Sequence, residues 1–202
     1  MRADAIVFGI AGSLFGLIIG WVLGTQNAGG TARLAAPVAQ AVPATPAAAP
    51  SAAQPAPLDP VRVQALQAAA EKDPKDLSSR VQLGNLFFDA EQYPQSIAWY
   101  EQAIALAPAD TNVSTDLGVA YYYTNQSDRA LKQFEKSLAS DPKHIKTLLN
   151  VGIVRAFGKN DLAGAAQAWE AVVALSPDSP EGQAAKKGLE GVKNAGAGTA
   201  GK

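Results

Sequence analysis

The sequence predicts an all-α helical solenoid, preceded by a single transmembrane helix and a disordered Pro/Ala-rich linker. Three observations lead to this prediction. Residues 5–24 form an apolar run without a charge, and residues 25–59 are dominated by Ala and Pro. Beyond them, prolines that follow apolar segments recur at intervals of 34, 34 and 35 residues, at Pro74, Pro108, Pro142 and Pro177. A period of this length is typical of solenoids built from stacked helix pairs.

The composition argues against most catalytic and nucleic-acid functions. The 202 residues carry 17 basic and 18 acidic side chains, so no excess of cations is available to neutralise phosphates, and we expect no nucleic-acid partner. The absence of Cys excludes disulfides and thiolate sites, and one His cannot form a His–His metal site within one chain. No P-loop, GxSxG or HExxH motif is present. We therefore expect no enzyme activity, no cofactor and no metal.

The N-terminal part has the length of a membrane span. After a short tail (residues 1–4), residues 5–24 would form a helix about 30 Å long, which matches a hydrocarbon core. A cleaved signal peptide is the alternative, although its apolar region is usually shorter. Arg2 and the α-amino group favour a cytoplasmic N-terminus. The remainder of the chain would then be periplasmic or otherwise extracytoplasmic.

Glycines recur every fourth residue of the predicted span, at Gly12, Gly16, Gly20 and Gly24. On a helix, this spacing places them along one stripe. Such a stripe lets a second helix approach closely, as in GxxxG pairs. We therefore expect transmembrane homo- or hetero-association.

The linker of residues 25–59 lacks aromatic side chains and apolar periodicity. Its prolines prevent a continuous helix and favour polyproline II, so we expect a disordered spacer with a reach of about 100 Å. A ligand for a Pro-binding domain is the weaker alternative, because no basic residue flanks the prolines.

Residues 60–202 are predicted to form the solenoid. Residues 60–74 look like the second helix of an upstream unit, and three helix-pair units follow at 75–108, 109–142 and 143–177. A capping helix over 178–195 starts with a polar cap and a proline, and 196–202 is expected to be a disordered tail. In each unit, small residues where helices must approach closely alternate with aromatics that can fill the gap between helices.

These units resemble the tetratricopeptide repeat (TPR) family. The first carries Leu83-Gly84, Phe87, Tyr93, Tyr100, Ala103 and Pro108; the second carries Leu117-Gly118, Tyr121, Ala130, Phe134 and Pro142; the third carries Val151-Gly152, Ala165, Trp169 and Pro177. Ser96 and Ser137 replace small Ala residues and Arg155 replaces an aromatic, so we expect looser packing there. The last unit also bears a weaker similarity to the TPR region of bacterial cytochrome c maturation proteins.

The resemblance implies a concave groove, lined by the first helix of each unit, that binds a peptide or helix of another protein. Carried over by register, the groove consists of Asn85, Phe88, Asp89, Thr115, Asp116, Val119, Tyr122, Tyr123, Lys146, Asn150, Ile153 and Phe157. Some relatives hold a partner's C-terminal carboxylate with a five-residue clamp. Here Asn85 and Lys146 match that clamp, whereas Val81, Asp116 and Asn150 do not, so we expect no such carboxylate site.

Three functions are consistent with these features of the sequence. The first is a membrane-anchored scaffold or adaptor that binds a protein partner in its groove and supports assembly of a membrane-associated complex. The second is an accessory structural subunit held through its glycine stripe, and an assembly factor for cytochrome c maturation is a further alternative. His144, at a helix start, is expected to be an exposed turn residue without a catalytic role.

Overall fold

The computed structural model describes residues 55–199, with side chains described to residue 195. The chain divides into two units, 1–54 and 55–202, and the second is described here. The predicted span, its glycine stripe and nearly all of the linker lie outside the described residues. Within the described part, no helix combines the length and the apolarity that a membrane crossing requires.

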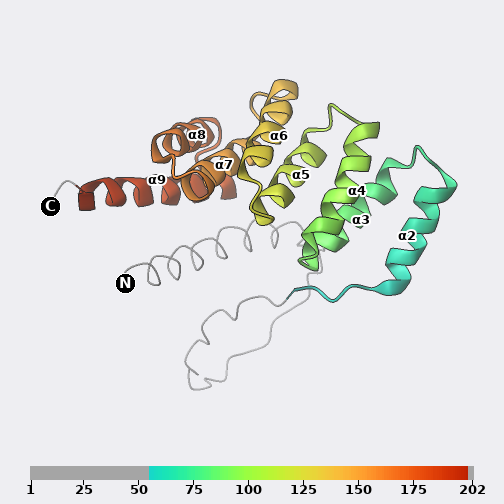
Figure 1. Cartoon of the computed structure of the whole chain (residues 1–202). Coiled ribbons are helices and arrows are strands. Elements are labelled where there is room, and N and C mark those ends of the chain that lie inside the picture. Colours follow the sequence, from blue (N-terminus) through green and yellow to red (C-terminus); the bar gives the residue numbers. More distant parts are fainter. Residues whose placement is uncertain (1–54, 200–202) are drawn as a thin grey trace, which may run out of the picture. The chain divides into compact units, whose positions relative to one another are not determined.

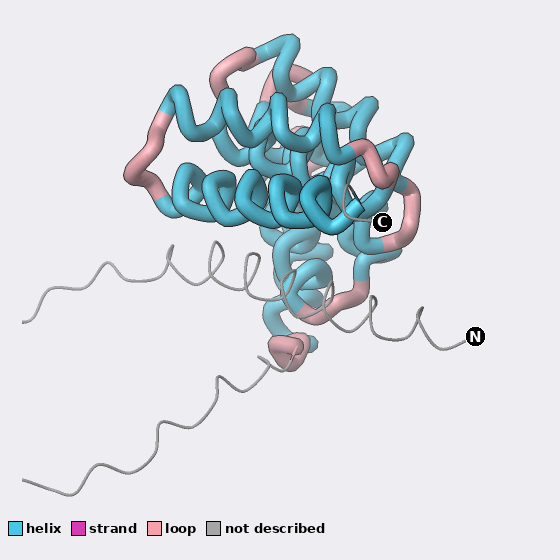
Figure 2. Tube along the Cα trace, turned by 90° about the vertical axis from the view of Figure 1, so that its left-hand side faces the viewer, coloured by secondary structure: helices cyan, strands magenta, loops and turns pink. Residues whose placement is uncertain are grey.

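The described part is an all-α helical array, as the sequence predicts (Figure 1). Consecutive helices lie side by side and are joined by short loops (Figure 2). The helices are α2 (Pro60–Lys72), α3 (Leu77–Asp89), α4 (Tyr93–Leu106), α5 (Thr111–Tyr123), α6 (Ser127–Ser140), α7 (Ile145–Ile153), α8 (Leu162–Leu175) and α9 (Pro180–Thr199). The pairs α3–α4, α5–α6 and α7–α8 fall within the three predicted units.

Aspartates define where several of these helices begin. The Oδ1 atoms of Asp76, Asp110 and Asp161 accept hydrogen bonds of 2.8–3.0 Å from backbone N–H groups three residues further on. Such side chains satisfy N–H groups that have no partner inside the helix. Asp76 and Asp110 each lie two residues after a repeat proline, whereas the third unit has His144 at this position, without a side-chain cap.

The turn between the two helices of each unit uses a left-handed residue. Glu91, Asn125 and Asn160 have φ angles of 56°, 59° and 54° at equivalent places in the three units. Asn tolerates this conformation better than most non-glycine residues, whereas Glu is destabilised there because its Cβ crowds the following carbonyl oxygen. These three positions were not predicted from the sequence.

A glycine of each first helix packs against an aromatic ring of the second helix. A Cβ atom at Gly84, Gly118 or Gly152 would lie 2.4, 2.3 or 2.2 Å from Tyr100, Phe134 or Trp169, respectively. All three rings are buried. The glycines recur every 34 residues because each unit needs the same close contact between its two helices.

The third unit accommodates its extra residue by changing helix type. The chain turns from α7 into a π-helical segment at Val154–Gly158, and Asp161 N–H then donates to the Arg155 carbonyl at 2.7 Å. Single π turns commonly absorb one additional residue in a helix. The half-buried Arg155 side chain lies 3.5 Å from the Asp161 carboxylate.

The C-terminal helix is longer than predicted. The sequence predicts that this helix ends at residue 195 and that 196–202 form a disordered tail, but α9 continues to Thr199. No proline follows Asn194, and glycines cost a helix only about 1 kcal/mol each, so an established helix can continue through them. Near its start, α9 packs against the last unit, where Gly188 lies beneath the Trp169 ring.

Candidate protein-binding groove

The predicted groove residues all lie on the first helices, α3, α5 and α7, and on the π-helical segment that follows α7. On α5, Asp116, Val119 and Tyr123 are spaced by three and four residues, and all are half-buried. This spacing places them on one helix face. On α3, Asn85 and Asp89 are exposed and Phe88 is half-buried. These two helices therefore present neighbouring polar and apolar side chains.

Four rings from three helices form an aromatic cluster, which consists of Phe88, Tyr93, Tyr122 and Tyr123. The Phe88 ring meets Tyr93 and Tyr123 edge-on, at centroid distances of 5.3 and 5.5 Å. Tyr93 stacks on Tyr123 at 4.6 Å, and Tyr122 lies 6.2 Å from Tyr123. Burial raises the pKa of the phenols of Tyr93, Tyr122 and Tyr123, so their hydroxyls stay protonated at neutral pH.

Tyr93 was not among the predicted groove residues, because it begins the second helix of its unit. Its ring nevertheless joins Phe88 of α3 to Tyr123 of α5. In the sequence, the only sign that Tyr93 would be packed is its position in the TPR motif. That motif does not predict which rings Tyr93 contacts.

Among the carboxylates of this surface, Asp116 has the pKa that is raised most. Among residues 55–199, its carboxylate has no hydrogen bond or ion pair. Burial raises its pKa to about 6, with further increases from Asp110 and Asp89, while Lys146 acts in the opposite direction. The nearby Tyr100 hydroxyl donates to Asn85 Oδ1 at 2.6 Å, which fixes the orientation of that amide. Partial desolvation also raises the pKa of Asp89, although its side chain is exposed, and its backbone carbonyl accepts from Ala56 N–H at 3.1 Å.

Two predicted groove residues are not on the surface, and the prediction is wrong for them. Thr115 and Ile153 are each only 3% exposed. Each helical residue is rotated by about 100° from its neighbour, so Thr115 points away from the side of Asp116 and towards the adjacent helices. The TPR register assigns both neighbours to the groove, although adjacent helical residues do not share one face.

Thr115 instead belongs to a hydroxyl network between the second and third units. Its Oγ1 atom lies 2.6 Å from Thr147 Oγ1 and 3.1 Å from Ser137 Oγ, and the last two oxygens are 2.9 Å apart. Ser137 is buried and hydrogen-bonded, so the looser packing expected there is not observed. Three residues from three helices meet here, and no local sequence pattern indicates such a meeting.

His144 is attached to the same network and is half-buried, which corrects the expectation of an exposed turn residue. Its Nδ1 atom lies 2.7 Å from Thr147 Oγ1. Burial lowers its pKa, which Asp141 partly opposes, so the ring is neutral at pH 7. The contact with Thr147 Oγ1 fixes the position of the His144 ring.

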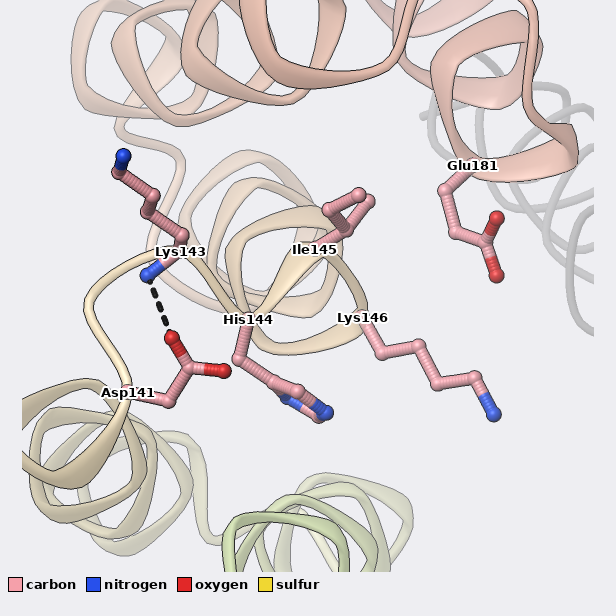
Figure 3. A pocket seen from close by; sticks show the side chains of 6 residues that line it. All are labelled: Asp141, Lys143, His144, Ile145, Lys146 and Glu181. Carbon is pink, nitrogen blue, oxygen red and sulfur yellow. Dashed lines mark hydrogen bonds between the residues drawn. The ribbon is translucent and has the colours of Figure 1, made fainter.

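Lys146 extends beside His144, towards a shallow hollow at the start of α7 (Figure 3). Lys143 N–H donates to Asp141 Oδ1 at 3.0 Å on the other side of this turn. Asn150 donates through Nδ2 to the Lys146 carbonyl at 2.8 Å, and Phe157 is 45% exposed. In the part of the chain that the structure describes, no group of three His, Asp or Glu side chains is arranged to hold a metal ion.

Comparison with known families identifies the repeats. A profile described as "TPR repeat" matches residues 84–125, and one described as "Tetratricopeptide repeat" matches residues 115–180. Residues 84–180 are tetratricopeptide repeats. The TPR resemblance drawn from the glycine, aromatic and proline positions is thereby confirmed, and TPR domains bind protein partners.

Among characterised proteins, the TPR region is similar to co-chaperones. It is 30% identical over 110 residues to the heat-shock protein cognate co-chaperone sgt12 of Aspergillus fumigatus, covering 54% of this chain and 32% of that protein. It is 28% identical over 109 residues to the Hsp70-Hsp90 organizing protein of Triticum aestivum, covering 54% and 19%, respectively. The chain therefore spans a third or less of the length of these relatives.

Solved structures show the same fold. The Sgt2 TPR domain of Aspergillus fumigatus superimposes with a TM-score of 0.55 at 28% identity, covering 59% of this chain and 78% of that domain. MamA 41-end from Desulfovibrio magneticus RS-1 gives 0.53 at 26% identity, with 58% and 67% coverage. The first TPR of Spaghetti (RPAP3), bound to the HSP90 peptide SRMEEVD, gives 0.56 at 22% identity, with 62% and 96% coverage, and supports the fold alone.

Proposed function

We propose that this protein is a membrane-tethered TPR adaptor, which binds a protein partner on the face of α3, α5 and α7 and supports assembly of a membrane-associated complex. One observation carries the binding proposal. The aromatic cluster lies next to the exposed Asn85 and Asp89 and the half-buried Asp116 on adjoining first helices. Apolar anchors beside polar groups are the composition that protein recognition sites favour.

The tether and the location are proposed from the sequence. The uncharged run of residues 5–24 supports an anchor, and the charges near it support a periplasmic or otherwise extracytoplasmic TPR region. Tethering would raise the local concentration of the groove near other membrane proteins. We also propose that the protein has no catalytic activity of its own and no cofactor.

Affinity purification of the full chain from membranes in mild detergent tests this proposal. The wild type is compared with Val119→Arg, which places a charge on the groove face of α5, and with Glu135→Arg, which introduces the same side chain at an exposed position of α6. We expect one or more proteins to be captured by the wild type and by Glu135→Arg and lost with Val119→Arg. Equal capture by all three forms would refute groove binding.

An accessory subunit held by the glycine stripe is the alternative, and assembly of c-type cytochromes is one pathway in which either role would fit. Replacing Gly16 and Gly20 with Leu should abolish association if the stripe holds the partner. If the groove holds it, residues 60–202 should still capture the partner. Capture by the full chain alone, with loss in the glycine variant, would favour the accessory subunit.

A further inference from the structure

We propose that the hydroxyl network between α5, α6 and α7 fixes His144 as its Nδ1–H tautomer. The other ring nitrogen, Nε2, then bears no proton and serves as a hydrogen-bond acceptor at the surface, for an N–H or O–H group of a bound molecule. His144 is the single histidine of the chain, so its state can be measured without ambiguity. The inference goes beyond the proposed groove binding and does not depend on it.

Three short contacts join the members of this network in a row. Thr115 Oγ1 donates to the Thr111 carbonyl oxygen at 2.6 Å. The same Oγ1 atom lies 2.6 Å from Thr147 Oγ1, which in turn lies 2.7 Å from His144 Nδ1. At such distances a proton must lie between the two atoms, because otherwise two lone pairs would face each other. The row therefore needs one proton for each of its contacts.

The hydroxyl groups of this row supply too few protons. Each hydroxyl has one proton, and a carbonyl has none. Thr115 gives its proton to the Thr111 carbonyl, so the proton between the two threonine hydroxyls comes from Thr147. The contact between Thr147 and His144 then lacks a proton unless Nδ1 supplies it. If Thr147 donated to His144 instead, one of the two 2.6 Å contacts of Thr115 would be left without a proton.

Ser137 does not change this count. Its Oγ atom lies 3.1 Å from the Thr111 carbonyl and 2.9 Å from Thr147 Oγ1, and its single proton serves one of these two contacts. Neither position lies between Thr147 and His144. The side chains of Thr115, Ser137 and Thr147 are at most 3% exposed, so they are shielded from water. The donors therefore run from His144 through Thr147 and Thr115 to the Thr111 carbonyl.

The second nitrogen of the His144 ring is available to a bound molecule. Within the described residues, both hydrogen-bond contacts of the ring involve Nδ1. The two nitrogens of an imidazole point in diverging directions, so Nε2 points away from the network. His144 is half-buried and borders the shallow hollow at the start of α7 (Figure 3), whose other lining residues are Asp141, Lys143, Ile145, Lys146 and Glu181.

The neighbouring charges determine when Nε2 is an acceptor. Burial lowers the pKa of the His144 ring, and Lys146 of α7 acts in the same direction, whereas Asp141 after α6 and Asp110 before α5 oppose it. The ring is therefore neutral at pH 7, and Nε2 accepts. At a pH below this pKa, Nε2 gains a proton and becomes a donor. Nδ1 carries its proton in both states, so the hydroxyl network is the same in both.

Nitrogen NMR of the full chain in detergent tests the tautomer. The chain is labelled with nitrogen-15 histidine and purified through a tag without histidine, so both ring signals come from His144. At pH 7 we expect Nδ1 at the chemical shift of a protonated nitrogen and Nε2 at that of an unprotonated one. On acidification, Nε2 should move to the protonated range with a midpoint below about pH 6.5, while Nδ1 moves little. The opposite assignment, or averaged shifts that report exchange between tautomers, would overturn the inference.

Substitutions of Thr147 test whether the network selects the tautomer. Thr147→Val removes the group that accepts from Nδ1–H, so the ring should shift towards the Nε2–H tautomer that a neutral imidazole favours in water. Thr147→Ser keeps the hydroxyl and should keep the wild-type signals. Thermal unfolding shows whether each variant is folded, and the wild-type signals decide the tautomer if Thr147→Val does not fold. Unchanged signals in folded Thr147→Val would overturn selection by the network.

Reaction with diethyl pyrocarbonate at pH 7 tests the surface acceptor. This reagent acylates an accessible imidazole nitrogen that bears no proton. Peptide mass spectrometry follows the modification of His144 in the native full chain and in the chain unfolded in urea. We expect comparable rates in the two states. Strong protection in the native chain would overturn the assignment of Nε2 as a surface acceptor and leave the tautomer to the NMR result.

Discussion

Substitution of Gly118 by Ala tests whether the repeated glycine–aromatic contact sets the packing of the array. The new Cβ would lie 2.3 Å from Cε1 and 2.6 Å from Cδ1 of Phe134, more than 1 Å inside ordinary carbon–carbon contact. Phe134 is fully buried, so its ring cannot move without displacing other core side chains. Overpacking of this kind costs about 1–3 kcal/mol. Ala also has a higher helix propensity than Gly, which offsets about 1 kcal/mol of this cost. The free energy of unfolding should therefore fall by up to about 2 kcal/mol.

Gly191 provides a matched control on α9, because nothing lies within 4 Å of a Cβ added there. Gly191→Ala should gain the propensity term alone and stabilise the fold by up to about 1 kcal/mol. Both variants are compared with the wild type by thermal and urea unfolding, monitored by far-ultraviolet circular dichroism. Phe134→Leu, combined with Gly118→Ala, should cost less than the sum of the two single changes. A melting temperature for Gly118→Ala at or above that of the wild type would refute the packing argument.

Three further predictions concern single side chains. Thr147→Val removes the hydroxyl that Thr115 and His144 both contact, so it should lower the free energy of unfolding by about 1–3 kcal/mol; an unchanged urea midpoint would show that the network adds no stability. Glu91 has a positive φ angle, which Asn tolerates better than Glu, so Glu91→Asn should stabilise the fold by up to about 1 kcal/mol. A lower melting temperature for this variant would contradict the idea that the Glu91 backbone is strained. The pKa of Asp116 is raised to about 6 in the folded state, so its ionisation there opposes folding increasingly as the pH rises from about 4 to 6. Asp116→Asn should therefore raise the melting temperature at pH 7 and have a smaller effect at pH 4, and equal effects at both pH values would argue against a desolvated carboxylate.

The repeat pattern made the helical array predictable from the sequence. Gly84, Gly118 and Gly152 each pack against an aromatic ring, so the constraint that fixes the spacing is local to one helix pair. The recurring prolines likewise indicated where one unit ends and the next begins. The extent of α9 was not predictable in the same way, since its last residues alternate Ala, the best helix former, with Gly, a poor one, so their preferences oppose each other.

The groove was only partly predictable, because it depends on contacts between helices. The register placed Asn85 and Asp89 correctly at the surface but also assigned the buried Thr115 to it. Tyr93 of α4 contacts Phe88 of α3 and Tyr123 of α5 in the aromatic cluster. Residue spacing within one helix cannot predict such contacts between helices. Arg80 is a similar case: it was not singled out in the sequence, yet its guanidinium donates to the carbonyls of Ala70 at 3.1 Å and Asp76 at 2.7 Å and joins α2 to the array.

Site-specific photo-crosslinking tests the central claim most directly, which is that the face of the first helices binds another polypeptide. A photoreactive amino acid is placed at Asn85, exposed on α3, and in a separate variant at Glu135, exposed on α6, in the full chain in its native cells. We predict a discrete adduct with another protein from position 85, lost when Val119→Arg is added, and no such adduct from position 135. The same adduct from both positions, or from position 135 alone, would contradict the assignment of the groove.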